Sequence, residues 1–192
     1  PSWTAMIRGM GLLLAWAADG LLEQFAVEAA LLDLLDSHRP PPGVLVDVGC
    51  ATGRLLRRAR ERYPDARLIG VDPAHAMLTA ARPRPSGSGL VRARAERLPL
   101  ADCGADVVTA TLSCRHWHDL AAGLREIARV LAPGGVFAYA DLTHPPPRRL
   151  NPRPRPDGLS RHLAAAGLAI QAQRVISGTV LFPWFRLVIA GR

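Results

Sequence analysis

A glycine-rich turn with one acid before it and another after it carries the strongest chemical signal in the sequence. The turn runs from Gly49 to Gly53, close behind Asp47, and Asp72 follows further along the chain. Glycines let a backbone turn sharply and approach a ligand where a Cβ atom would collide, and a following helix offers free N–H groups. Asp72 could accept two hydrogen bonds from ribose hydroxyls, or it could cap the helix predicted after Pro73. With the glycine turn at this distance, the pattern favours binding of a ribose.

Strands and helices alternate around these residues, which predicts a parallel sheet. Strands are predicted over 44–48, 67–72, 89–93, 105–110 and 136–140. Helices are predicted over 21–36, 55–63, 73–82, 121–131 and 159–166. The segments 168–176 and 179–190 are typical of an antiparallel pair of strands, and Pro183 in the second indicates a bulge or an edge position.

The predicted fold is α/β, a Rossmann-like, seven-stranded, mostly parallel sheet with an antiparallel last strand and helices on both faces. In such sheets ligands bind at the carboxyl ends of the strands. Asp47 and Asp72 lie at the ends of two predicted strands, so they are expected at that edge. Residues 1–39 are predicted to form an N-terminal helical cap segment, and residues 40–192 to form the ligand-binding domain.

Four segments resemble, in the same order, the sequence blocks of the class I S-adenosylmethionine (SAM) dependent methyltransferases. They are 44–56 (VLVDVGCATGRLL), 70–78 (GVDPAHAML), 95–108 and 124–137, and the resemblance covers roughly residues 40–190. It is closest to the small-molecule group that includes the ubiquinone and menaquinone enzymes. The resemblance implies SAM as cofactor, S-adenosylhomocysteine (SAH) as product and a small organic acceptor, with transfer to oxygen favoured.

The resemblance also implies which residues surround the cofactor. The methionine part is expected beside Asp47, Gly49 and Gly53, the ribose on Asp72, the adenine beside Ala95 and Glu96, and the sulfonium above Leu112 and Ser113. Further contacts are expected from the neighbouring residues Cys50, Ala51, Pro73 and Met77.

The chain departs from the family pattern at three positions. Ala51 replaces a frequent glycine, Ala105 replaces a usual phenylalanine, and Arg94 stands where an Asp often accepts from the adenine amino group. Because an arginine cannot accept a hydrogen bond, adenine recognition is expected to fall to Glu96 or to backbone groups.

Transfer to a hydroxyl needs a base as well as in-line alignment. His116 is the first candidate, because a histidine pKa suits proton removal near neutrality, and His118 is the second. By resemblance, the loop that holds them faces the substrate, so His116 and Trp117 are predicted to line the acceptor pocket together with His144 and Trp16. Alternatively, Trp117 only packs and Asp119 caps the next helix.

The charge of the chain invites a different interpretation. Among 192 residues the net charge is +8, and all 24 basic residues are arginine. A GC-rich genome would produce this composition without a polyanion partner, so a nucleic-acid partner is not expected. Two alternatives stay open: an RNA or DNA methyltransferase, for which 145–156 is the best polyanion-binding segment, and a protein of this fold that binds ligand without methylating or catalyses another reaction.

The cysteines and the apolar segments bear on the compartment. Cys50, Cys103 and Cys114 are odd in number and lack paired spacing, so we expect neither disulfides nor a metal site. The apolar stretch 10–18 is too short to span a bilayer. We expect a cytoplasmic protein without a membrane span, and the sequence leaves its oligomeric state open.

Overall fold

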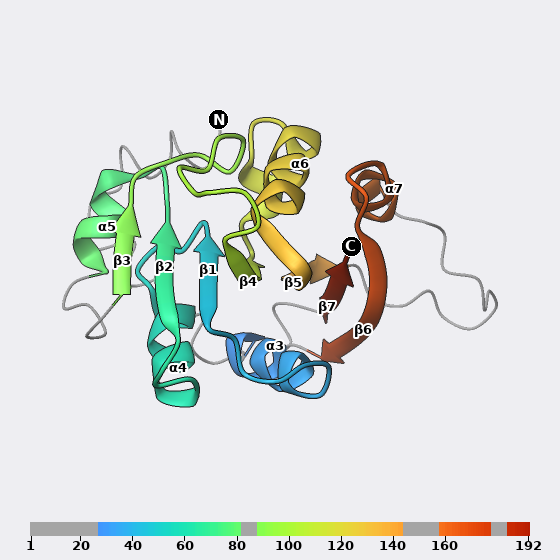
Figure 1. Cartoon of the computed structure of the whole chain (residues 1–192), viewed down its shortest axis with the longest axis horizontal. Helices are drawn as coiled ribbons and strands as arrows, with labels where there is room; N and C mark the ends of the chain where they lie inside the picture. Colours follow the sequence, from blue (N-terminus) through green and yellow to red (C-terminus); the bar gives the residue numbers. More distant parts are fainter. Residues whose placement is uncertain (1–26, 82–87, 144–157, 178–183) are drawn as a thin grey trace.

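Seven strands form one sheet in the order β3-β2-β1-β4-β5-β7-β6 (Figure 1). The computed structural model describes residues 27–81, 88–143, 158–177 and 184–192. The strands are β1 (Val44–Val48), β2 (Arg67–Val71), β3 (Ser88–Val91), β4 (Ala105–Thr111), β5 (Leu131–Thr143), β6 (Ala169–Ser177) and β7 (Trp184–Gly191). Neighbouring strands are parallel except that β7 is antiparallel to both β5 and β6. The predicted fold class is thereby confirmed.

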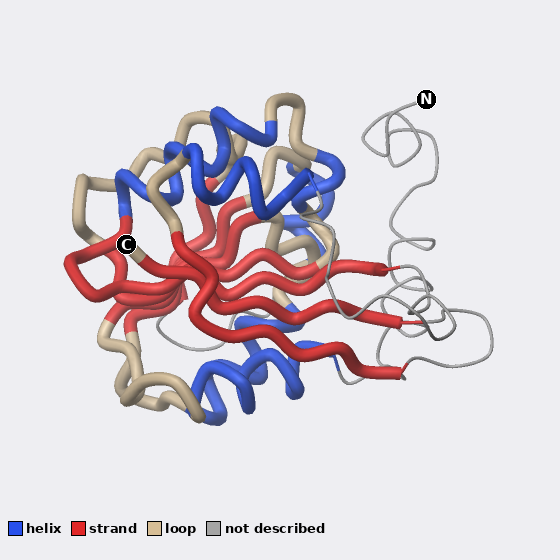
Figure 2. Tube along the Cα trace, turned by 90° about the vertical axis from the view of Figure 1, so that its right-hand side faces the viewer, coloured by secondary structure: helices blue, strands red, loops and turns tan. Residues whose placement is uncertain are grey.

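Helices cover both faces of the sheet, as Figure 2 shows from the side. They are α3 (Val27–Asp36), α4 (Arg54–Arg62), α5 (His75–Ala80), α6 (Leu120–Val130) and α7 (Gly158–Ala165), with one 3-10 turn, η1 (Cys114–His116). Successive side chains of a strand point to opposite faces. Accordingly, Leu45 of β1 packs in a core with α3 and α4, whereas Val46 packs in the core that includes α6 and α7.

Some boundaries differ from those predicted. The helix predicted over 121–131 ends at Val130, and β5 begins at the next residue instead of at 136. Residues between 131 and 136 form an irregularity in the pairing of β5 with β4, because Ala105 pairs with Leu131 but Val107 pairs with Val136.

The last strand is not at the edge of the sheet. The structure confirms the antiparallel pair, but β7 lies between β5 and β6, so the edge position inferred from Pro183 is wrong. Pro183 itself lies outside the described residues. The register shift of this pair falls in β6, between Ile170 and Ala172.

The N-terminal helix is confirmed over Val27–Asp36, where it packs against α4, β5 and β7. Trp16, His144 and the segment 145–156 lie outside the described residues, so the predicted cap over residues 1–39 stays a prediction. In the ranges that the structure describes, no helix is long and apolar enough to cross a membrane.

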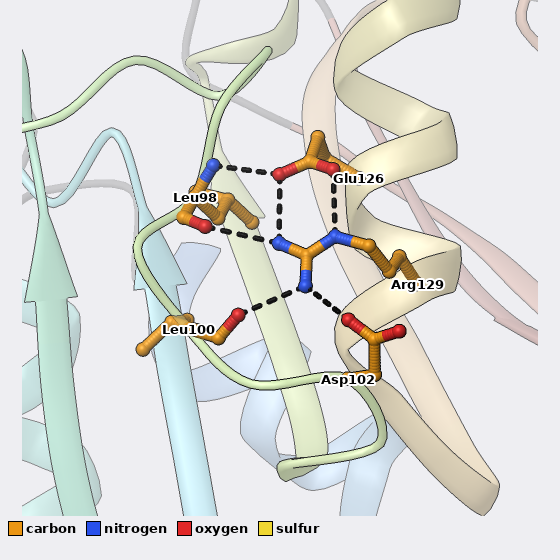
Figure 3. A network of polar contacts seen from close by, with 5 residues as sticks. All are labelled: Leu98, Leu100, Asp102, Glu126 and Arg129. Carbon is orange, nitrogen blue, oxygen red and sulfur yellow. Dashed lines mark hydrogen bonds and ion pairs between the residues drawn. The ribbon is translucent and has the colours of Figure 1, made fainter.

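Arg129 of α6 fastens the connection between β3 and β4 to the body of the fold (Figure 3). Its guanidinium donates to the carbonyl oxygens of Leu98 and Leu100, both at 2.9 Å, and pairs with Asp102 at 2.6 Å. Glu126 binds the same guanidinium at 2.7 Å and accepts from Leu98 N at 2.8 Å. This network fixes the chain directly after the predicted adenine residues.

Candidate functional site

The glycine turn lies at the carboxyl edge of the sheet and is bonded to the end of β2. The N–H groups of Gly49 and Cys50 both donate to Val71 O, at 2.7 and 3.1 Å, and Ala51 N donates to Asp72 Oδ2 at 3.0 Å. Because β1 and β2 are adjacent and parallel, their ends meet at this edge. The structure thus brings together the two sequence blocks that were predicted to hold the methionine part and the ribose.

Gly49 packs directly against Ser113, the second residue after β4. It has a φ of +79°, and a Cβ atom built on it would lie 2.4 Å from Ser113 Cβ. Ser113 Oγ in turn donates to Val48 O at 2.8 Å, and Leu112 N donates to Ala140 O at 2.7 Å. Leu112 and Ser113 are therefore held beside the glycine turn, at the end of the neighbouring strand.

Asp72 is buried, and both of its carboxylate oxygens accept backbone hydrogen bonds. Oδ2 binds Ala51 N, and Oδ1 binds Ala74 N at 2.8 Å. Burial raises the pKa of Asp72, and the two N–H donors oppose that rise. The residue at the N-cap of α5 is Ala74, so Asp72 orders the turn before the helix without being its cap. A carboxylate has about four acceptor sites, and the two N–H groups leave room for ribose hydroxyls.

Asp47 is buried at the end of β1, and its Oδ1 accepts from Thr109 Oγ1 at 2.8 Å. Burial, opposed by this hydrogen bond and reinforced by the charges of Glu28 and Asp72, raises the pKa of Asp47 to about 7. The edge therefore gathers several acids in a region of low polarity.

Ala51 stands in the glycine turn in a conformation that favours glycine, with a φ of 47°. A left-handed conformation is unfavourable for alanine by roughly 1–2 kcal/mol, and glycine avoids this cost. Glycine also makes the unfolded chain more flexible, which offsets part of the gain in stability. We expect Ala51→Gly to raise the free energy of unfolding by about 0.5–1 kcal/mol, measured by urea denaturation. Cys103→Gly is the matched control, because Cys103 has a similar positive φ of 56°. It precedes β4 and so lies at the edge of the sheet opposite to the glycine turn. A destabilised Ala51→Gly variant would contradict this account of the turn.

The predicted adenine and ribose neighbours lie near the same edge. Ala95 is buried, and Glu96 Oε1 accepts from Asp119 N at 3.0 Å, which ties the adenine segment to the start of α6. Met77 is buried in α5, whereas Pro73 and Arg94 are exposed. With Arg94 exposed, Glu96 and the neighbouring backbone remain the acceptors near the expected adenine.

The candidate bases lie on or just after η1. His116 and His118 are both exposed, and Arg115 Nε donates to His116 Nε2 at 3.2 Å. Partial burial, and after it the charge of Arg115, lower the pKa of His116. Arg115 also pairs with the buried Asp141 of β5 at 3.0 Å. Arg115 therefore links η1 to the end of β5 while it orients the imidazole.

Trp117 and Asp119 show contacts that the packing interpretation requires. A Cβ atom built on Gly123 of α6 would lie 2.5 Å from Trp117 Cε3, so the indole ring lies flush against the helix. Asp119 caps α6, since its side chain accepts from Ala122 N at 2.9 Å. Burial raises the pKa of the thiols of Cys50 and Cys114, which favours their neutral form.

A buried ion pair at this edge, between Glu28 of α3 and Arg54 of α4, was not predicted from the sequence. A signal for it exists in the sequence. Glu28 falls at helical spacing from Leu31, Leu32 and Leu35, which places an acid on the apolar face of a helix. No group of residues in the described part of the chain has the composition of a metal site.

Known proteins share both the sequence pattern and the fold. Residues 46–139 match the family described as "Methyltransferase domain". The demethylmenaquinone methyltransferase of Thermus thermophilus is 34% identical over 138 residues, which are 70% of this chain and 60% of that protein. A malonyl-(acyl-carrier protein) O-methyltransferase of Dechloromonas aromatica is 40% identical over 102 residues, 53% of this chain and 37% of that protein. The chain thus spans less than two thirds of the length of either relative.

A solved structure extends the likeness over nearly the whole chain. The 1,6-didemethyltoxoflavin-N1-methyltransferase of Burkholderia thailandensis, determined with bound 1,6-didemethyltoxoflavin and S-adenosylhomocysteine, gives a TM-score of 0.77. The match covers 98% of this chain and 88% of that chain at 18% sequence identity, so it shows the shared fold.

Proposed function

The chain carries a methyltransferase domain of the class I SAM-dependent family, and on that basis we propose that it transfers the methyl group of SAM to a small organic acceptor. One observation carries the proposal: Ala51 N in the glycine turn donates to Asp72, which unites the two cofactor blocks in one site. An acceptor oxygen is favoured, and the Dechloromonas relative is named as an O-methyltransferase. The Burkholderia relative is named as an N1-methyltransferase, so the acceptor atom must be found by experiment.

The described residues fit the cofactor. Gly49 and Gly53 give the turn its positive φ angles, Gly49 packs against Ser113 with no space for a Cβ atom, and Asp72 retains acceptor capacity for ribose hydroxyls. The acids Asp47 and Glu28 lie near the turn and suit a ligand that carries positive charge. When bound, SAM supplies a methyl group on a positively charged sulfur.

The chain's own residues would bind and orient the cofactor and deprotonate the acceptor. The glycine turn and Asp72 fix the cofactor end of the site, and Ser113 borders it from β4. His116 follows on η1 and is oriented by Arg115, so it is the side chain proposed to take the proton from a hydroxyl acceptor. Trp117, packed against α6, supports the loop that holds this histidine.

A base role for His116 predicts a particular pH profile. A base must be unprotonated, and the pKa of His116 lies below its ordinary 6.5. We therefore expect turnover to stay level as the pH falls from 8 toward 6.5 and to decline only below it. His116→Ala should reduce turnover by about 100-fold or more, measured as SAH formed with an acceptor found by screening phenols and carboxylic acids. Unchanged turnover of this variant over pH 6–9 would remove His116 as the base.

Isothermal titration calorimetry tests the cofactor half of the proposal. We expect saturable binding of both SAM and SAH to the wild-type chain. Absence of binding by either ligand at high micromolar concentration would contradict the proposed function.

We also propose that the protein works in the cytoplasm and has no nucleic-acid partner. Three free cysteines, two of them buried, support a reducing compartment. The two sequence relatives are named for a quinone-related compound and for an acid on an acyl-carrier protein, which supports a small acceptor group rather than a nucleic acid. Tight binding of RNA that weakens steeply with salt would overturn this part of the proposal.

A further inference from the structure

A buried ion pair joins the first turn of α3 to the first residue of α4. Arg54 Nε donates to Glu28 Oε1 at 2.8 Å, and Arg54 Nη2 contacts the same oxygen. Both residues are buried, with 3% of Glu28 and 8% of Arg54 exposed. Because Arg54 directly follows Gly53, the last residue of the glycine turn, the pair lies against the end of the site proposed for the methionine part.

The second oxygen of Glu28 lacks a partner. Both contacts from Arg54 fall on Oε1, whereas Oε2 is buried and accepts no hydrogen bond. A buried acceptor left unsatisfied is unfavourable by about 1–3 kcal/mol, and more when it is charged. Such an arrangement is expected where a ligand supplies the missing donor.

The surroundings of Glu28 indicate that the missing donor is a cation. Asp47 lies close enough for its pKa to be raised by burial first and then by the charge of Glu28, with a further contribution from Asp72. The charges of Glu28 and Asp72 thus both act on Asp47 at this edge, and Arg54 is the cation bonded to Glu28 among the described contacts. A positively charged group placed between the acids would relieve their mutual repulsion and satisfy Oε2.

We infer that Glu28 Oε2 accepts a hydrogen bond from the α-ammonium group of the cofactor, so that Glu28 recognises the amino-acid end of SAM and SAH. The inference rests on the proposed function. Arg54 acts as the positioning residue, since its guanidinium holds the carboxylate of Glu28 from the opposite oxygen.

This role makes a prediction about ligand selectivity. The compound 5′-methylthioadenosine has the nucleoside and the sulfur of SAH but no amino-acid part. Removing the charge of Glu28 should therefore weaken SAH binding and leave binding of 5′-methylthioadenosine as it was. A merely structural ion pair, which affects the whole site through folding, would change both affinities together.

The test compares Glu28→Gln with Asp33→Asn by calorimetric titration of both ligands. Glutamine keeps an oxygen that can accept from Arg54 but turns the other position into an amide donor, which opposes an ammonium group. Asp33→Asn is the matched control, because it removes another α3–α4 ion pair, Asp33 with Arg62 at 2.7 Å, on the exposed side. Urea denaturation of each variant measures any loss of stability.

We expect the Kd of SAH to rise about 20-fold in Glu28→Gln, a little under 2 kcal/mol, with that of 5′-methylthioadenosine unchanged within about twofold. Asp33→Asn should leave both affinities unchanged. Equal weakening of the two ligands, or an unchanged affinity for SAH, would overturn the inference. If Glu28→Gln does not fold, Glu28→Asp, which withdraws the carboxylate by one methylene group, should show the same selectivity. Failure of the wild-type chain to bind either ligand would instead refute the proposed function.

Discussion

Replacing Gly49 with alanine should disrupt both the fold and cofactor binding. The new Cβ atom would lie 2.4 Å from Ser113 Cβ and 2.8 Å from Ser113 Oγ, at a φ of +79°. The left-handed conformation contributes roughly 1–2 kcal/mol and the overlap a similar amount, so unfolding should become easier by about 3 kcal/mol. The overlap displaces the glycine turn, and SAH can bind only when the turn returns to its position. Because this return is unfavourable, we expect the affinity for SAH to fall about 100-fold. Urea denaturation and calorimetry measure the two effects.

Two controls separate conformation from overlap. Gly134 has a similar φ of +73°, but no atom lies within 4 Å of a Cβ built there. Gly134→Ala should therefore lose only about 1–2 kcal/mol and keep its SAH affinity. In the double variant Gly49→Ala, Ser113→Gly, the overlapping atoms are gone, and part of the stability should return. A Gly49→Ala variant that binds SAH like the wild type would contradict the close packing described at this edge.

Removal of the Asp72 side chain should abolish most of the cofactor affinity. A carboxylate that accepts two ribose hydroxyls contributes about 1.5–3 kcal/mol for each hydrogen bond, so Asp72→Ala should weaken SAH binding by about 100-fold or more. The variant also leaves the N–H groups of Ala51 and Ala74 without their hydrogen-bond acceptor. A moderate loss of stability is therefore expected beside the loss of affinity.

Asp106 provides the matched control for this second effect. Its Oδ2 accepts from Gly43 N at 2.9 Å and from Val44 N at 2.8 Å, at the amino end of β1. Asp106→Ala thus also removes the acceptor of two backbone N–H groups, but at the opposite edge of the sheet. It should lose a comparable amount of stability and bind SAH normally. If both variants lost SAH affinity equally, Asp72 would be a structural residue and not a ribose ligand.

Much of the fold could be predicted because local patterns decide it. The apolar residues Val44, Leu45, Val46 and Val48 of β1 need two covered faces, and the strand–helix alternation then indicates a parallel sheet. The glycine turn was found because positive φ values restrict residue choice, and Gly49 and Gly53 both adopt them. Asp72 was found because a sheet places the ends of adjacent parallel strands together.

What escaped prediction depends on contacts between distant segments. The position of β7 inside the sheet follows from its pairing with both β5 and β6, which a proline in the sequence does not reveal. The Glu28–Arg54 pair joins two helices, and although helical spacing places Glu28 on an apolar face, it does not identify Arg54 as its partner. The bond from Arg115 to Asp141 likewise joins η1 to β5 across the sheet edge. Spacing along one segment does not identify the partner residue in such pairs.

A crystal structure of the chain with SAH tests most directly whether the carboxyl edge of the sheet is the cofactor site. We predict density for the ribose at Asp72, for the amino-acid part beside Gly49 and Glu28, and for the adenine near Glu96. A pocket lies at the opposite edge of the sheet, lined by Asp102, Arg125, Ala165 and Arg192 among others. SAH bound in that pocket, with the carboxyl edge empty in the same crystal, would contradict the assignment.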